Sequence, residues 1–502
     1  MTATDLAADI DEALSADDER IREQAQEEAE ALLAAIDDGA FDNSQALVGL
    51  ELELYAVDAQ TDALRRVPRR LLDLIGYEKE LGLHNVETQT TPQPLNIHGL
   101  EAQKRELQAT LASAIDRTLA EDIRLVSDGL WTVPPVGASA REYLTDAVEA
   151  DGVTIATNMS DAVRYHAMAN TDYPAGMTID APHVSLDAET VMPESLITSI
   201  QPHYQVPRAS ALPEHFRYAL RIAGPLLAIG VNSPFFPPGL YDDVSAETIL
   251  DDANMANRID VFESVLNATD GPGKVRFPDD IDSIEGAVQA VLDDPMIVPM
   301  DVPRGNRFDD QFATIRHKHG SFWRWVRPVF DGATRSAANA RIEFRPLGAQ
   351  PTIHDAVAFQ AVFAGLMKSL PRLEHPVANL DWDQAHDNFR AAARDGLQAE
   401  MTWITGDGAE TTATDQILGE LFEYAREGLE MRDLSTEQAR RYVRPLRERV
   451  DRRMTPARWK HAQVRDQVAD GVPIGEAIWG MQSRYIEYQS QTLVEGQFSD
   501  WL

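Results

Sequence analysis

The pattern of apolar and polar positions divides the chain into a helical beginning, a mixed middle and a helical end. Residues 5–37 are rich in Ala and Glu, with apolar positions at helical spacing, which predicts a helix. The middle mixes short alternating segments, typical of strands, with helical stretches such as 99–120 and 213–229. The last part is mainly helical in pattern. The fold class predicted from these elements is α+β.

These changes of pattern predict three parts. They are an N-terminal acidic helical extension (1–45), an α+β core (46–370) and a helical C-terminal region (371–502) that we expect to pack on the core. Pro- and Asp-rich breaks near 268–282 and 295–310 have the composition of turns, and we interpret them as loops inside the core.

Strict alternation gives the strand that begins at Leu47 two different faces. Leu50, Leu52 and Leu54 point one way, and Glu51 and Glu53 point the other. Two carboxylates spaced in this way lie about 7 Å apart on one face. They repel each other unless cations lie between them or water screens them. An exposed strand with solvated glutamates is the simpler interpretation of this segment alone.

Three further segments repeat this design of one apolar and one polar face. Their polar residues are Asn85, Glu87 and Gln89; His183, Ser185 and Asp187; and Arg341, Glu343 and Arg345. If all four segments belong to one sheet, its polar face carries four glutamates, one histidine and two arginines. The prediction fails if the polar faces do not converge.

This set of side chains suits metal and nucleotide chemistry. Carboxylate oxygens are hard ligands for Mg²⁺ or Mn²⁺, and histidine joins them at a site that tolerates Mn²⁺. An arginine on the same face can bind phosphate oxygens through two N–H groups at once, and it stabilises charge on a transferring phosphoryl group. The sequence holds no GxxxxGK[ST], GxGxxG, HExxH or GxSxG motif. A nucleotide enzyme without a phosphate loop must hold phosphates with metals and arginines.

The composition of the chain excludes several kinds of site and makes several kinds of partner unfavourable. With 45 Lys and Arg against 82 Asp and Glu, the net charge is −37, and there is no cysteine. Disulfides, thiolate metal sites and a cysteine nucleophile are therefore excluded. Such an acidic chain repels nucleic acid and anionic lipid as a whole. Acidic excess with few lysines favours a protein from a high-salt organism, where screening makes self-repulsion tolerable; an acidic, GC-rich proteome is the alternative.

Neither a membrane segment nor a signal peptide is visible, so we predict a cytoplasmic protein. The arginine-rich stretch 440–465 has two interpretations. It could bind RNA or another polyanion, or it could pair with the protein's own acidic surface. The net charge favours the second interpretation.

Taken in order, several segments resemble the type 2 glutamate–cysteine ligase and carboxylate–amine ligase family. The matching segments are 49–53, 86–87, 183–187, 228–235 and 341–346. The resemblance covers roughly residues 46–370, which would then be the catalytic domain. It implies a glutamine-synthetase-like fold, a funnel of curved antiparallel sheet with helices outside. It also implies ATP and Mg²⁺ (or Mn²⁺) as cofactors, and an amide formed through an acyl phosphate.

The resemblance also implies roles for individual residues. The metal ligands would be Glu51, Glu53, Glu87, His183 and Glu343. Arg345 and Glu53 would be catalytic, and Arg345 and Arg341 would bind the nucleotide. The substrate would be bound by Arg258, Ser185 and Asn232. Asn232 has a structural alternative, because Asn-Ser-Pro favours a turn. Many members carry His-x-His in the central strand, and Ser185 departs from that pattern.

The function expected from this resemblance is the ATP-dependent joining of glutamate and cysteine to γ-glutamylcysteine. The same chemistry with another amine acceptor is one alternative. A catalytically silent protein that binds ATP or an amino acid is another, and a polyanion-binding protein is a third. The expected partners are small-molecule substrates, namely glutamate and an amine such as cysteine, without nucleic acid or membrane; a homo-oligomer is left open.

Overall fold

The computed structural model describes residues 2–171, 177–267 and 273–502. Within these residues an eight-stranded antiparallel sheet has the order β11-β12-β10-β1-β3-β2, with β4 and β5 also paired to β1. Its strands are β1 (Leu47–Asp58), β2 (Glu78–Lys79), β3 (Asn85–Gln89), β4 (Gln93–Pro94), β5 (Ile123–Val126), β10 (Ile200–Gln205), β11 (Val326–Asp331) and β12 (Asn339–Phe344).

Three two-stranded hairpins stand apart from this sheet. They pair β6 (Ala147–Ala150) with β7 (Val153–Ala156), β8 (Thr178–Ala181) with β9 (Val184–Asp187), and β13 (Trp403–Ile404) with β14 (Glu410–Thr411).

Helices make up most of the remaining secondary structure. They are α1 (Ala3–Leu14), α2 (Asp18–Asp37), α3 (Arg69–Ile75), α4 (Ile97–Leu119), α5 (Ala140–Thr145), α6 (Val163–Met168), α7 (Leu212–Gly230), α8 (Ala246–Asp252), α9 (Asn257–Leu266), α10 (Ile284–Asp293), α11 (Ala313–His319), α12 (Ile353–Arg372), α13 (Trp382–Asp395), α14 (Thr414–Glu430), α15 (Thr436–Asp451), α16 (Pro456–Ala469) and α17 (Ile474–Thr492). In the part of the chain that the structure describes, no helix is long and apolar enough to cross a bilayer.

One face of the main sheet is buried under helices. Leu50, Leu52 and Leu54 of β1 point into this apolar layer, as their alternation predicts. α12 packs on β1 and β10, α7 on β11 and β12, and α4 on β4 and β5. α7 and α12 are apolar on almost every side because both also contact further helices. The opposite face of the sheet carries the polar residues.

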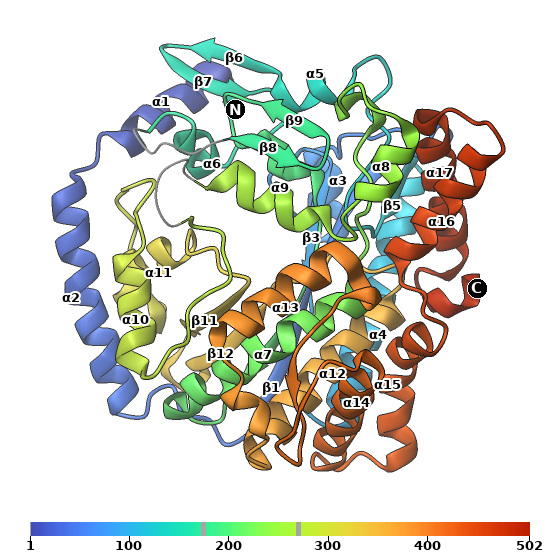
Figure 1. Cartoon of the computed structure of the whole chain (residues 1–502). Coiled ribbons are helices and arrows are strands. Elements are labelled where there is room, and N and C mark those ends of the chain that lie inside the picture. Colours follow the sequence, from blue (N-terminus) through green and yellow to red (C-terminus); the bar gives the residue numbers. More distant parts are fainter. Residues whose placement is uncertain (1, 172–176, 268–272) are drawn as a thin grey trace.

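The N-terminal helices form one flank of the molecule, and α16 and α17 form the opposite flank (Figure 1). The helix predicted at 5–37 is two helices, because Asp17 caps the first turn of α2 and ends the run before it. α2 packs on α10 and α11. Its buried Glu28 accepts hydrogen bonds from the backbone N–H groups of Thr314 (2.6 Å) and Ile315 (3.1 Å), which caps α11.

The C-terminal helices share the core with the rest of the chain. Gly428 of α14 lies so close to Gly365 of α12 that a Cβ there would stand 1.8 Å from the Gly365 carbonyl oxygen. Only glycine permits this approach of two helices. On the other flank, Lys460 of α16 forms a buried ion pair with Asp128, which follows β5. The division of the chain into three parts stays a prediction.

Candidate active site

The register of the main sheet brings most of the predicted polar side chains onto one face. Residues directly opposite each other in an antiparallel sheet point to the same side. β1 and β3 place Glu53 opposite Glu87, and β10 and β12 place His203 opposite Glu343. We call the side of the sheet that carries them the polar face. Three of the four predicted segments therefore converge.

Glu343 is the centre of the arginine-rich end of the polar face. Arg327 of β11 donates to it from Nε (2.8 Å) and Nη2 (3.2 Å), and Arg345 donates from Nη1 (2.6 Å). Burial raises the pKa of Glu343, but Arg327 and Arg345 outweigh burial and hold the pKa well below its ordinary value. Glu343 is therefore ionised and fully engaged with these guanidinium groups, which limits its capacity to bind a metal.

Glu53 is held rigidly at the centre of the sheet. Its carboxylate accepts hydrogen bonds from the backbone N–H of Ser199 (2.7 Å), the Ser199 hydroxyl (2.8 Å) and the Gln201 amide (2.9 Å). Gln201 in turn accepts a hydrogen bond from Arg345 at 2.8 Å. Glu53 is therefore oriented in advance, as an electrostatic or metal-binding carboxylate requires.

The remaining glutamates form an acidic end of the polar face. Burial and the charge of Glu343 raise the pKa of Glu51 to about 8. Burial and the neighbouring carboxylates, with Glu80 the largest, raise the pKa of Glu87 to about 11. Both shifts reflect burial beside neighbouring carboxylates.

His203 of β10 lies between the two ends. Its Nδ1 accepts a hydrogen bond from Arg341 Nε at 3.3 Å, so the proton of the neutral ring sits on Nε2. Nε2 lies 3.4 Å from Glu51 Oε1 but makes no hydrogen bond among the described residues. Burial lowers the pKa of His203 to about 4, which keeps the ring neutral. His203 is therefore a neutral donor directed at the polar face.

Arg341 and Arg258 frame this face. Arg341 also forms an ion pair with Asp331 at 2.8 Å. Arg258 lies in the first turn of α9 and donates from Nη1 to the backbone carbonyl of Arg345 (3.0 Å). Burial lowers its pKa to about 10, although Glu53 acts in the opposite direction. The predicted nucleotide and substrate arginines thus lie at the same site.

The placement of His183 in the central sheet is wrong. His183 and Ser185 belong to the hairpin β8–β9, which forms no ladder with the main sheet. His183 occupies the turn of that hairpin with a φ of +59° and bonds Asp252 at 2.7 Å. Ser185 is exposed and accepts from Arg141 through its backbone. A short hairpin and a sheet strand have the same alternation, so the pattern alone could not separate them.

Asn232 lies behind the site rather than on the polar face. It is buried just after α7, and its amide donates to the carbonyl of Ala349 (2.7 Å) and to Tyr485 (3.2 Å). These contacts agree with the structural alternative for this residue. Its predicted contact with substrate stays a prediction.

Residues of β10 and two further glutamates at the site were not predicted from the sequence. Gln201, His203 and Gln205 alternate along β10 just as Glu51 and Glu53 do along β1, and this signal was available. Glu80 and Glu194 gave no such signal because they lie outside regular strands. Burial and Glu53 raise the pKa of Glu80, and burial with Glu80 and Glu53 raises that of Glu194 to about 8.

Among the described residues, no three His, Asp or Glu side chains converge closely enough to hold a metal ion as they stand. The chemistry of the donor set nevertheless fits a hard divalent cation. Glu51, Glu53 and Glu87 supply carboxylate oxygens on one face, and a cation between them would relieve their repulsion. His203, with its proton on Nε2, fits a donor to an anion better than a metal ligand.

The arginine-rich helix α15 is paired with the protein's own acidic groups. Arg441 pairs with Glu101, Arg447 with Glu423 (3.6 Å), Arg449 with Asp355 (2.8 Å) and Arg453, just after α15, with Asp415 (3.0 Å). These contacts favour the pairing interpretation over a polyanion surface.

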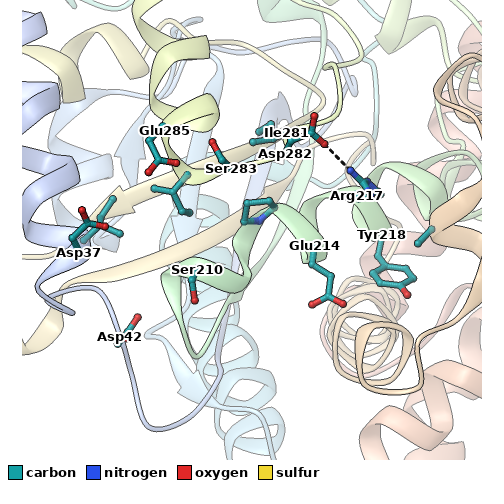
Figure 2. Close-up of a pocket in the computed structure, with 14 residues that line it drawn as sticks. Asp37, Asp42, Ser210, Glu214, Arg217, Tyr218, Ile281, Asp282, Ser283 and Glu285 are labelled. Atoms are coloured by element: carbon teal, nitrogen blue, oxygen red, sulfur yellow. Dashed lines mark hydrogen bonds and ion pairs between the residues drawn. The ribbon is translucent and has the colours of Figure 1, made fainter.

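A separate cavity of about 760 Å³ lies between the end of α2, the start of α7 and residues 281–285. Its polar lining includes the acidic residues Asp37, Asp42, Glu214, Asp282 and Glu285, and Arg217 is bonded to Asp282 at 2.8 Å (Figure 2). Glu343 and Arg345 are not among its lining residues. Since an acidic lining alone identifies no ligand, the polar face of the sheet remains the candidate site.

The main sheet is antiparallel, its polar face sets arginines beside crowded carboxylates, and helices pack on its other face. This arrangement suits the binding of phosphate groups and divalent cations. A family comparison agrees with this. The model of glutamate–cysteine ligase family 2 matches residues 47–478, and the chain belongs to that family. It is accordingly an ATP-dependent carbon–nitrogen ligase that joins a carboxylate to an amine.

A solved structure agrees in fold. A glutamate–cysteine ligase from Francisella tularensis, in complex with AMP, is 14% identical with a TM-score of 0.53, covering 90% of this chain and 91% of that one. A bifunctional glutathione synthetase from Pasteurella multocida is 12% identical with a TM-score of 0.47, covering 92% and 55%. No curated protein matches the chain by sequence.

Proposed function

We propose that this chain forms γ-glutamylcysteine from glutamate and cysteine with consumption of ATP, in the cytoplasm and with Mg²⁺. The observation that carries the proposal is the polar face itself, where Arg327 and Arg345 meet Glu343 beside the carboxylates of Glu51, Glu53 and Glu87. The match to glutamate–cysteine ligase family 2 supports the choice of substrates. The acidic composition supports a high-salt setting.

In this proposal the arginines hold phosphate oxygens. A carboxylate oxygen of glutamate attacks the γ-phosphorus, the bond to ADP breaks, and an acyl phosphate results. The amine then attacks the acyl carbon, phosphate leaves, and the amine loses one proton. Arg345, fixed by Glu343 and Gln201, stabilises negative charge on the transferring group. His203 donates from Nε2 to an anionic oxygen.

Mg²⁺ would be held by Glu51, Glu53 and Glu87, and when bound it supplies neutralisation of phosphate charge. The hydrogen bonds from Ser199 and Gln201 keep Glu53 facing that position. Glu343 is already bonded to Arg327 and Arg345. We therefore assign it a second role, to orient these two arginines, in addition to its predicted role as a metal ligand.

The test is ADP release in molar KCl with Mg²⁺, ATP and glutamate, with and without cysteine, together with the mass of the product. Glu53→Gln and Glu343→Gln should each lower kcat by about 100-fold or more. Glu189→Gln, on an exposed connection, is the matched control. Turnover that requires a different amine would overturn the choice of cysteine. ATP binding without turnover, with any amine, would favour the catalytically silent alternative.

A further inference from the structure

The imidazole of His203 meets a hydrogen-bond donor, and that donor is an arginine. Arg341 Nε donates to His203 Nδ1 at 3.3 Å, and the ring makes no other hydrogen bond within the described part of the chain. The residue opposite His203 on β1 is Gly49, which has no side chain to hold the ring from that strand. The hydrogen-bonding state of the imidazole therefore depends on Arg341.

Arg341 is itself held by two residues at the end of the β11–β12 ladder. Its Nη1 forms an ion pair with Asp331 (2.8 Å) and donates to Asn339 Oδ1 (3.2 Å). Asp331 and Asn339 lie opposite each other on the two strands, and the Asn339 amide also donates to the backbone carbonyl of Asp331 at 3.3 Å. The guanidinium is thus fixed at one end, and its Nε keeps its position beside His203.

The donor beside Nδ1 decides which nitrogen of the ring carries the proton. A neutral imidazole has one N–H and one lone pair, so a donor at Nδ1 places the proton on Nε2. A histidine that binds a metal normally donates its second N–H to a carboxylate or carbonyl, which leaves a lone pair for the ion. Arg341 imposes the opposite arrangement. Nε2 lies 3.4 Å from Glu51 Oε1 and 3.9 Å from Glu343 Oε2, so the nitrogen nearest these carboxylates carries a proton.

We propose that Arg341, anchored by Asp331, withholds His203 from the metal site and thereby keeps that site selective for hard cations such as Mg²⁺. Imidazole nitrogen favours Ni²⁺ and Zn²⁺, whereas carboxylate oxygens suit Mg²⁺. With the histidine withheld, the donors that remain are carboxylate oxygens such as those of Glu53 and Glu87. Arg341 is then a positioning residue that sets metal specificity through His203. This inference rests on the proposed function and extends it to the choice of metal.

The experiment measures the binding of Mg²⁺ and of Ni²⁺ to the full chain by calorimetry, in molar KCl without nucleotide. In Arg341→Met the ratio of Ni²⁺ affinity to Mg²⁺ affinity should rise by about 10-fold or more, because the ring can then offer a lone pair at Nε2. His203→Asn alone should leave the wild-type ratio unchanged, and adding it to Arg341→Met should remove the rise. The ratio is the readout because loss of a cation strengthens the binding of every divalent ion.

Two further variants isolate the effect. Arg335→Met is the matched control, because Arg335 is an arginine with a 55% exposed side chain just before β12, paired with Asp38; it should leave the ratio unchanged. Arg341→Met leaves Asp331 without its ion-pair partner, so Asp331→Asn combined with Arg341→Met keeps the test valid if the single variant unfolds, and it should show the same rise. An unchanged ratio in a folded Arg341 variant overturns the inference, as does a lowered ratio in His203→Asn alone.

The position of the proton gives a second readout that needs no metal. In protein labelled with ¹⁵N-histidine, the chemical shift separates a protonated from an unprotonated ring nitrogen, and comparison with His203→Asn assigns the signals of this residue. Wild type should carry the proton on Nε2, and Arg341→Met should shift part of the population to Nδ1. A proton on Nδ1 in wild type, or no shift in Arg341→Met, overturns the inference.

Failure of the proposed function gives a different result. If Glu53→Gln leaves the Mg²⁺ affinity of wild type unchanged, Mg²⁺ is not held on the polar face and the metal assignment of that function is wrong. The ¹⁵N measurement then decides by itself whether Arg341 sets the proton of His203. If Glu53→Gln weakens Mg²⁺ binding but Arg341→Met leaves the Ni²⁺ to Mg²⁺ ratio unchanged, the metal assignment holds and the selectivity inference alone is overturned.

Discussion

The buried ion pair between Lys460 and Asp128 should be a major source of stability. Asp128 is 0% exposed and Lys460 is 2% exposed, and they join α16 to the segment after β5. Lys460 also donates to the carbonyl of Asn232 at 2.9 Å, and Gln482 donates to Asp128 at 2.9 Å. Lys460→Met removes the cation and leaves the carboxylate buried, with only neutral donors around it.

Breaking a buried pair from one side costs about 3–5 kcal/mol, whereas an exposed pair is worth about 0–1 kcal/mol. We therefore expect Lys460→Met to lower the free energy of unfolding by about 3–5 kcal/mol. Arg458→Met is the matched control, because Arg458 is an exposed cation on the same helix; its cost should be about 0.5 kcal/mol or less. Adding Asp128→Asn to Lys460→Met should recover part of the loss, because no buried charge then remains.

The assay is urea unfolding in molar KCl, followed by tryptophan fluorescence and far-UV circular dichroism. The urea concentration at the unfolding midpoint should fall for Lys460→Met and stay within error of the wild-type value for Arg458→Met. If Lys460→Met costs no more than Arg458→Met, the pair does not carry stability and the reasoning is refuted. A double variant that is less stable than Lys460→Met would likewise contradict the role assigned to the unpaired carboxylate.

Three further predictions concern other parts of the molecule. Glu28→Ala should cost about 1–3 kcal/mol in unfolding experiments because it uncaps α11, while exposed Glu27→Ala should cost little. Gly428→Ala should destabilise by about 1–3 kcal/mol or more through its clash with Gly365, whereas Gly419→Ala on the same helix, with nothing within 4 Å, should be neutral or stabilising. Burial and Glu343 raise the pKa of Glu51 from 4.5 to about 8. The stability contributed by its neutral form is therefore fully present below pH 4.5 and is lost as the pH rises to about 8. Without divalent cations, the free energy of unfolding of Glu51→Gln should rise relative to wild type across that window by at most about 1.4 kcal/mol per pH unit.

Local patterns predicted the elements of the fold well where one face is apolar. The helices predicted at 99–120 and 213–229 are α4 and α7, within two residues at either end. The strand predicted to begin at Leu47 is β1, as its alternation implied, and it is the longest strand of the sheet. What the pattern could not give was pairing. Strand order depends on long-range contacts, and the segment 183–187 has the same period whether it lies in the main sheet or in a separate hairpin.

The site was predicted to the extent that its residues alternate on strands. Glu51, Glu53, Glu87 and Glu343 share one face because their strands pair in register, and the register follows from the buried apolar face. His203 was missed although it alternates with Gln201 on β10, because the segment 183–187 has the same alternation and also carries a histidine. Glu194 could not be found from the sequence, because only the folded chain brings its 3₁₀ turn (Met192–Leu196) against α9.

The distribution of charge along the polar face limits the kind of ligand that fits it. At one end Arg327 and Arg345 more than neutralise Glu343, which leaves a net positive end. At the other end Glu51, Glu53 and Glu87 lie on neighbouring strands; burial and Glu343 raise the pKa of Glu51, and burial with the neighbouring carboxylates raises the pKa of Glu87. An anion alone would satisfy the first end and be repelled by the second, and a free cation would do the reverse. A polyphosphate that carries divalent cations matches both ends, since its oxygens can face the arginines while its cations face the carboxylates. The two ends therefore have complementary roles for one ligand, which explains why a chain with a net charge of −37 places arginines on this face at all.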